Sequence, residues 1–396
     1  MTPAWQTVAL GVLMFAAMAA YALFSGADFG GGIWDLLAGG DRRGEKPRAA
    51  IDASVTPVWE GNHVWIIFGL VILWTAFPPA FAAIMTVLFV PLSLSLLGIV
   101  MRGVGFAFRH EAERLPTKRL SGALFAASSL MTPFFLGVCV GAVATGRIPA
   151  QPTGNDLGAW TSPTAVVTGL LFVAACAYIG GVYLVADSDR RHDEEMTRYF
   201  RRRAMVAGVV TGLLAAVNML LLHGSAPYLW HRLFGPALPA VAVSVAAGVA
   251  ALGLLVLNRP NLLRITAALA VVGVVAGWGV AQYPYLLPGQ LTLTAGTEPL
   301  SGQEAELAVM VLAGLLVVPS FVWLYWLQQR GKLAETEASE GLRVAVAAEN
   351  ARDLDGSPPP REPHPVVEAV VLTAAASLLV KETGRRLLRR DRRRGA

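Results

Sequence analysis

The sequence has little charge, and this shortage excludes an ordinary soluble domain. Only 15% of its residues are Asp, Glu, Lys or Arg, whereas 55% are hydrophobic; a typical soluble chain is about 25% charged. The uncharged residues lie in long runs, and a helix that crosses a membrane needs about 20 apolar residues. One run, 61–101, divides at Pro78 and Pro79, where a helix must stop or bend. The sequence therefore predicts an all-α polytopic membrane protein, with nine helices near residues 5–27, 58–77, 80–101, 120–145, 163–186, 204–222, 237–257, 264–282 and 307–328.

Cysteine and histidine are also scarce, which argues against most metal and haem sites in this chain. The two cysteines, Cys139 and Cys176, fall in apolar runs, so a disulfide framework and a thiolate metal site are excluded and packing roles are expected. Glu60 and His63 form one Glu-x-x-His pattern, whereas di-iron bundles need two. Of the six histidines, only His63 lies near acidic residues of a span. We therefore expect this chain to bind neither haem nor metal.

The basic residues indicate the topology. Lys and Arg concentrate in the cytoplasmic loops of membrane proteins. The connections between the predicted helices alternate between rich and poor in these residues, and the poor ones hold only Arg147 and Arg232. This pattern places the N-terminus outside the cell and the C-terminus in the cytoplasm. Because loops that fix the topology account for the net charge of +5, we expect no nucleic-acid partner.

The helices fall into groups along the chain. A polar loop, 146–162, separates eight of them into two sets of four, and the short connections within each set favour antiparallel bundles. We predict a first four-helix bundle over 1–145, a second over 163–282, and a peripheral ninth helix at 307–328. The uncharged outer stretch 281–296 contains Pro and Gly and is expected to form a structured cap on the second bundle.

The last part of the chain has a different composition. Residues 331–396 begin as a charged, proline-containing segment, typical of a cytoplasmic linker, and end in a basic amphipathic tail. Within the tail, the apolar stretch 366–380 precedes a cluster of arginines. Two alternatives stay open for this stretch: a helix on the inner membrane surface, attracted to anionic lipid, and a tenth span.

Two carboxylates lie at the cytoplasmic ends of predicted spans. Asp28 ends the first helix and Glu60 opens the second. A carboxylate at the bilayer centre costs ~2.5–3.5 kcal/mol and is tolerated when it faces a bundle or a wet cavity. Glu60 and His63 are three residues apart and share a helical face, and Asn62 adds an amide. We predict a proton pathway that includes Asp28, Glu60, Asn62 and His63; in the alternative, each carboxylate caps its helix or reaches the lipid headgroups.

Small and aromatic residues surround this cluster. Gly26 and Gly30 are four residues apart, a spacing that lets a neighbouring helix backbone approach closely. We expect this pair to position the first helix. Trp59 and Trp65 flank the acidic position of the second helix, where they can position the cluster or anchor at the membrane interface.

Two arginines follow the third predicted helix. Arg102 and Arg109 can both anchor at lipid headgroups. Arg102 can instead turn inward and pair with a carboxylate at the same membrane depth, either Glu60 or Asp28. Both alternatives stay open for Arg102 from the sequence, and we include the two arginines among the positioning residues.

Four stretches of the sequence resemble subunit II of cytochrome bd-type quinol oxidases. They are "GADFGGG", "PVWEGNHVW", "RGVGFAFR" and "YPYLLPGQLTLTAG", which occur in the family's order, and the resemblance covers residues 5–330. It implies two four-helix bundles plus a peripheral helix, multi-pass in the bacterial inner membrane. It also implies a partner, subunit I, that carries haem b and haem d and the quinol site. A structural quinone in this chain, a small single-helix accessory subunit and the kind of quinol are left open.

The resemblance also implies roles for particular residues. Glu60 matches the acidic position of the family's W-[DE]-G-N motif, part of a proton route from the cytoplasm towards the oxygen-reducing haem. Asp28 matches the acidic residue of the first helix, whereas His63 occupies a position that is glutamine in some relatives, which puts its titration in doubt. The implied function is a haem-free subunit that scaffolds subunit I and supplies proton uptake for O2 reduction. Two rivals are a proton-coupled transporter and a partner with a purely structural role.

Overall fold

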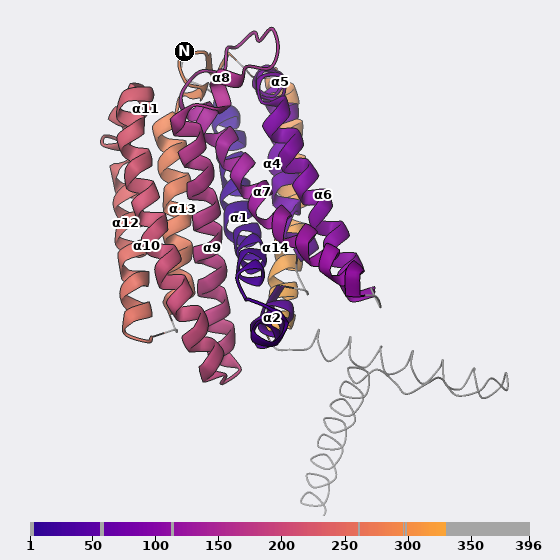
Figure 1. Ribbon diagram of the computed structural model, residues 1–396. Coiled ribbons are helices and arrows are strands. Elements are labelled where there is room, and N and C mark those ends of the chain that lie inside the picture. The colour runs from indigo at the N-terminus through magenta and orange to yellow at the C-terminus, as the bar shows by residue number, and fades with distance from the viewer. Residues whose placement is uncertain are drawn as a thin grey trace, which may run out of the picture. The chain divides into compact units, whose positions relative to one another are not determined.

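The computed structural model describes residues 4–55, 59–111, 115–259, 262–295, 297 and 299–329 (Figure 1). The predictions for the tail 331–396, including those for the stretch 366–380, therefore concern residues outside the described part of the chain. The remaining chain is almost entirely helical, with a single small antiparallel pair of strands among the described residues. The elements are α1 (Trp5–Leu36), α2 (Asp41–Val55), α3 (Trp59–Asn62), α4 (Val64–Ala76), α5 (Pro78–Val87), α6 (Phe89–Glu111), α7 (Leu115–Ala144), α8 (Leu157–Trp160), α9 (Pro163–Arg190), α10 (Glu194–Ser225), α11 (Pro227–Leu233), α12 (Leu238–Val256), α13 (Leu263–Gln282), β1 (Tyr285–Leu287), β2 (Leu291–Thr292) and α14 (Leu300–Gln329).

The length and apolarity of these helices confirm an all-α polytopic membrane protein. Within the described part of the chain, seven helices are long and apolar enough to cross a membrane. The pair α4 and α5 also meets this test but bends by 117° at its break, and would make an eighth span. The apolar part of α6, Phe89–Gly105, is shorter.

The uncharged run 61–101 holds three helices, so the prediction of one continuous helix over 80–101 was wrong. α4 ends before Phe77, and α5 starts with Pro78 at its first position, where proline lacks only a hydrogen bond that the helix would not make. α5 ends at Val87, and α6 starts at Phe89. The predicted stop at Pro78 was right, but the prediction overlooked Pro91, which has no N–H to bond to the carbonyl of Val87 and so accounts for the second break, at Leu88.

α1 extends to Leu36, so the predicted end near residue 27 was also wrong. Asp28 lies inside this helix, about 12 Å of helical rise before its end. Three consecutive glycines, 30–32, follow it without breaking the helix. Glycine has a low helix propensity. These three glycines are buried against neighbouring helices, and this packing stabilises the helix by more than the low propensity destabilises it.

The close approach predicted for the glycines of α1 involves α9. A Cβ atom placed on Gly30 would lie 2.8 Å from the Cα atom of Gly180, and the carbonyl oxygen of Cys176 is nearer still. At Gly26, a Cβ atom would lie 3.8 Å from the sulfur of Cys176, which is ordinary contact. Gly30 and Gly180 therefore form the point of closest backbone contact between α1 and α9.

Both predicted sets of four helices belong to one compact unit, Met1–Leu315. In it, α7 packs on α6 and α9, α10 packs on α9, and α12 packs on α13. α1 contacts α4, α7, α9 and α13 and so touches helices of both sets. The division into two bundles stays a prediction. The rest of α14 belongs to a second unit, Leu316–Ala396.

Polar contacts hold the first turns of α14 to α1 and α4. Thr7 Oγ1 donates a hydrogen bond of 2.7 Å to Gln303 Oε1, and Gln6 Nε2 donates one of 3.1 Å to Glu304 Oε1. Thr75 of α4 donates to the carboxylate of Glu306. The cap predicted over 281–296 contains the β1–β2 hairpin, and Gln282 Nε2 donates to Leu286 O at 2.6 Å.

The contact of Gly30 with α9 yields a first prediction. Gly30→Ala should lower the melting temperature of the purified protein, because the added methyl group overlaps backbone atoms and overpacking costs about 1–3 kcal/mol or more. Gly212→Ala on α10 is the matched control, since no atom lies within 4 Å of its added Cβ. Alanine there should be neutral or slightly stabilising. Equal melting temperatures for the two variants would show that the α1–α9 contact is not tight.

Candidate functional site

Polar residues follow one face of α1 inside the apolar protein. The polar residues Ser25 and Asp28 are three residues apart, and Gly32 follows four residues later, so all three lie on the same side of the helix. Asp28 is only 4% exposed and Ser25 is fully buried. A buried carboxylate needs a charged or hydrogen-bonding partner, so this face of α1 must meet one.

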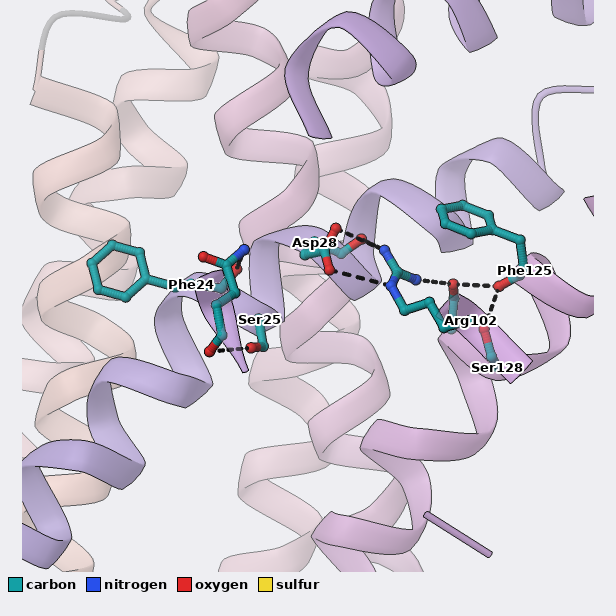
Figure 2. Close-up of polar contacts among 8 residues, drawn as sticks. Phe24, Ser25, Asp28, Arg102, Phe125 and Ser128 are labelled. Carbon is teal, nitrogen blue, oxygen red and sulfur yellow. Dashed lines mark hydrogen bonds and ion pairs between the residues drawn. The ribbon is translucent and has the colours of Figure 1, made fainter. Parts of the chain in front are cut away.

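The partner of Asp28 is Arg102 of α6. Figure 2 shows the guanidinium facing the carboxylate: Arg102 Nη2 lies 2.7 Å from Asp28 Oδ1, and Arg102 Nε lies 3.2 Å from Asp28 Oδ2. Arg102 Nη2 also donates a hydrogen bond of 2.9 Å to the backbone oxygen of Asp28. This bidentate geometry is the strong form of an arginine–carboxylate pair. Of the alternatives open from the sequence, the structure has Arg102 turned inward to Asp28.

Residues of α7 complete the surroundings of the guanidinium. Arg102 Nη1 donates a hydrogen bond of 2.6 Å to Ser129 Oγ, and that hydroxyl donates one of 2.7 Å to Phe125 O. The rings of Phe125 and Phe29 lie 4.4 Å and 5.0 Å from the guanidinium carbon, distances at which an aromatic face attracts a cation. Arg102 is 1% exposed, so protein groups take the place of water around it.

Gly32 makes room for this arrangement. A Cβ atom at Gly32 would lie 2.7 Å from the Cβ atom of Ser129 and 3.1 Å from Arg102 Nη1. Only glycine therefore allows α1 to approach the serine and the arginine this closely. Gly32, the last glycine of "GADFGGG", thus makes room for the ion pair, whereas Gly30 makes room for the contact with α9.

Asn62 joins the start of the second predicted helix to α1. Ser25 Oγ donates a hydrogen bond of 3.2 Å to Asn62 O, and Asn62 Nδ2 donates one of 3.4 Å to Phe24 O (Figure 2). Asn62 is 3% exposed. Since Ser25 and Asp28 are one turn apart, Asn62 lies one helical turn of α1 away from the ion pair.

His63 and Trp65 also pack on α1. The ring of His63 lies 5.9 Å from the ring of Tyr21 and 6.0 Å from the ring of Phe29. Trp65 stacks on Phe24 with ring centres 6.2 Å apart. Both residues are half-buried, so Trp65 packs against another helix of the chain and His63 lies among aromatic rings beside the ion pair.

Three predicted site residues have side chains outside the described part of the structure. They are Trp59, Glu60 and Arg109. The backbone of Glu60 lies in the short helix α3, two residues before Asn62. Among the described residues, no three His, Cys, Asp or Glu side chains gather in a way that could hold a metal ion.

The sequence did not single out Ser129, Phe125 or Phe29. One signal for Ser129 was present: Ser128 and Ser129 are small polar residues within an apolar helix, where such residues often form hydrogen bonds between helices. The two phenylalanines carried no signal, because an apolar span contains many such residues that only pack.

Comparisons with known proteins place the chain among respiratory membrane proteins. The family model described as cytochrome bd terminal oxidase subunit II matches residues 6–328. A predicted cytochrome bd menaquinol oxidase subunit II of Bacillus subtilis is 23% identical over 325 residues, which cover 79% of this chain and 92% of the relative. The cytochrome bd-I ubiquinol oxidase subunit 2 of Escherichia coli is 23% identical over 367 residues, with 80% and 91% covered. In the structure of the bd oxidase from Geobacillus thermodenitrificans, one chain has the same fold, with a TM-score of 0.64, 21% identity, and 82% of this chain and 98% of that chain covered.

The buried pair yields a second prediction. Asp28→Leu or Arg102→Met alone should destabilise the protein by about 3–5 kcal/mol, because each leaves one charge buried without its partner. The double variant should recover much of this loss, since it buries neither charge. Thermal unfolding of the four proteins measures the coupling.

The exposed ion pair between Lys46 and Glu195 provides the control. Its side chains are 71% and 64% exposed, so Lys46→Met should change the melting temperature little. If the single variants of Asp28 and Arg102 lowered the melting temperature as little as Lys46→Met does, the account of the buried pair would be contradicted.

Proposed function

Since the chain belongs to the cytochrome bd terminal oxidase subunit II family, we propose that it works in a quinol oxidase as the subunit that supports subunit I and supplies protons for O2 reduction. Membership of the family implies the partner subunit I. The names of the two relatives give menaquinol and ubiquinol, so the proposal covers a quinol of either kind. The family membership favours this function over a proton-coupled transporter.

The chemistry of the reaction explains why such a subunit needs buried polar groups. Reduction of O2 to water consumes protons together with electrons, and oxidation of a quinol releases both. If the protons consumed come from the cytoplasm and those released leave outside, the reaction generates a membrane potential. In this proposal the haem b and haem d groups of subunit I supply electron transfer and O2 reduction, and the residues of this chain handle protons only.

The observation that carries the proposal is the buried pair of Asp28 and Arg102. Bidentate contacts of 2.7 Å and 3.2 Å hold the carboxylate in place. A proton on Asp28 would leave the guanidinium, which is 1% exposed, as an unpaired buried charge. We therefore assign Asp28 to the pathway as a group that stays paired with Arg102 and holds the polar face of α1 in place, while other groups carry the protons.

The groups proposed to carry protons are Glu60 and His63. Asn62 lies between Glu60 and His63 in the chain, and Ser25 donates a hydrogen bond to Asn62 O. The amide of Asn62 and the hydroxyl of Ser25 can hold a water molecule between Glu60 and His63. Trp65, Gly26 and Gly30 position α1 and the start of the second span through the contacts described above. Glu60 can accept a proton at the mouth of the span and pass it towards His63 and the face of α1.

The orientation of the chain is also part of the proposal. In Figure 1, α2 lies at one end of the helices of the first unit and α5, α8 and α11 lie at the other. The basic residues of α2 and of the α9–α10 connection lie at the end where α2 is found. Because Lys and Arg concentrate on the cytoplasmic side of membrane proteins, we assign this end to the cytoplasm. The N-terminus is then outside and the C-terminus inside.

Glu60→Gln yields a third prediction. It should slow O2 consumption with quinol by about tenfold or more, because a glutamine cannot pass on a proton and relayed proton transfer contributes at least this much. The haem content of the complex, measured from its visible spectrum, should stay nearly unchanged. Glu60→Asp is the matched control and should keep most of the activity. An unchanged rate in Glu60→Gln would remove Glu60 from the route and favour a purely structural role.

The orientation yields a fourth prediction. Asn155→Cys and Glu194→Cys place one exposed thiol near each end of the helices, while the native Cys139 and Cys176 are buried. A membrane-impermeant maleimide should label Asn155→Cys in spheroplasts and label Glu194→Cys only after the membrane is opened. The reverse pattern would show that the C-terminus is outside.

A further inference from the structure

A buried tyrosine extends the polar face of α1 away from the ion pair. Tyr21 lies four residues before Ser25 and seven before Asp28, spacings that place all three on one side of the helix. Tyr21 is 8% exposed. With the N-terminus outside, as proposed above, its separation from Asp28 along the helix puts Tyr21 about 10 Å further from the cytoplasm.

The hydroxyl of Tyr21 is buried and forms no hydrogen bond with the described part of the chain. The side chain of Ser25 lies beside it, but Ser25 Oγ donates its proton to Asn62 O at 3.2 Å. Buried hydroxyl groups nearly always bind a protein group or an ordered water molecule. A buried water molecule needs more than one polar partner, and the lone pairs of Ser25 Oγ together with the Tyr21 hydroxyl supply them. This part of the α1 face is therefore suited to hold a water molecule.

Tyr21 also contacts His63, which the proposed function assigns as a proton carrier. The centres of the two rings are 5.9 Å apart. His63 directly precedes α4 and follows Asn62, whose backbone oxygen accepts the hydrogen bond from Ser25. Tyr21, Ser25 and His63 therefore meet at one place beside α1. A water molecule there can join the hydroxyl of Tyr21 to a ring nitrogen of His63.

A second tyrosine shows that a buried hydroxyl alone does not indicate a pathway. Tyr178 of α9 is 4% exposed, and its hydroxyl also forms no hydrogen bond with the described residues. Tyr178 packs on α10, because a Cβ atom placed on Gly208 would lie 3.0 Å from its ring. Other residues of α9, Cys176 and Gly180, make the close contact with α1. What distinguishes Tyr21 from Tyr178 is therefore its place between Ser25 and His63.

We propose that Tyr21 carries protons onward from His63 through a water molecule bound between the Tyr21 hydroxyl, Ser25 and His63. The water molecule takes a proton from the His63 ring and gives one to the phenol oxygen, which releases its own proton to a further water molecule on the side away from Asp28. Because one O–H bond forms as the other breaks, no charged phenolate has to exist in apolar surroundings. This inference rests on the proposed function and extends its route towards the middle of the membrane.

The test compares Tyr21→Phe with the matched control Tyr178→Phe in the whole oxidase complex. Each change removes one buried hydroxyl and keeps the ring, so both variants should retain the melting temperature and the haem content of the wild type. Tyr21→Phe should slow O2 consumption with quinol by about tenfold, because the route loses a carrier, whereas Tyr178→Phe should not. The remaining rate of Tyr21→Phe should also fall more in D2O than the wild-type rate does, since proton transfer then limits turnover.

Three results would overturn the assignment of Tyr21. These are a wild-type rate in Tyr21→Phe, equal slowing in the two tyrosine variants, and a slowed Tyr21→Phe whose sensitivity to D2O matches that of the wild type, which would indicate a packing role.

Glu60→Gln, measured in the same assay, separates this inference from the proposed function. If Glu60→Gln slows turnover and Tyr21→Phe does not, the proton-uptake function stands and Tyr21 is not part of the route. If neither variant slows turnover, the proton-uptake role of the chain fails together with the role of Tyr21.

Discussion

The cost of burying a charge among apolar helices is the constraint on which this structure depends. Asp28 and Arg102 are both almost completely buried, and an isolated charge in such a place would cost several kcal/mol. The two are tolerated because each satisfies the other, and because Ser129 and two phenylalanine rings replace the water that arginine would otherwise bind. α1, α6 and α7 must therefore meet at one point, and Gly32 is the residue of α1 that lets them do so.

The same constraint shapes what α1 can do for function. One face of the helix carries the ion pair and the contact with Asn62, while Gly30 brings α9 against it. A helix held on several sides fixes its polar groups relative to the second span, and a proton pathway needs such fixed distances.

Much of this arrangement could be predicted from the sequence, because its causes are local. Uncharged runs mark the spans, Asp28 is conspicuous in an apolar run, and the spacing of Gly26 and Gly30 indicates close packing. The remainder depends on contacts between distant residues. α1 continues through three glycines because α9 packs against them, and the choice of Asp28 as the partner of Arg102 depends on how α1, α6 and α7 are arranged. The break at Leu88 could have been predicted, because Pro91 in the first turn of α6 signals it. The two bundles and the pathway through Glu60 stay predictions.

A reduced-minus-oxidised visible spectrum of the complex, purified through a tag on this chain from its own cells, tests the account most directly. If the chain serves as subunit II of a quinol oxidase, the preparation contains a second large chain and shows the absorption bands of b-type and d-type haem. A colourless preparation that contains this chain alone, even in mild detergent, would contradict the proposed function and would favour the transporter.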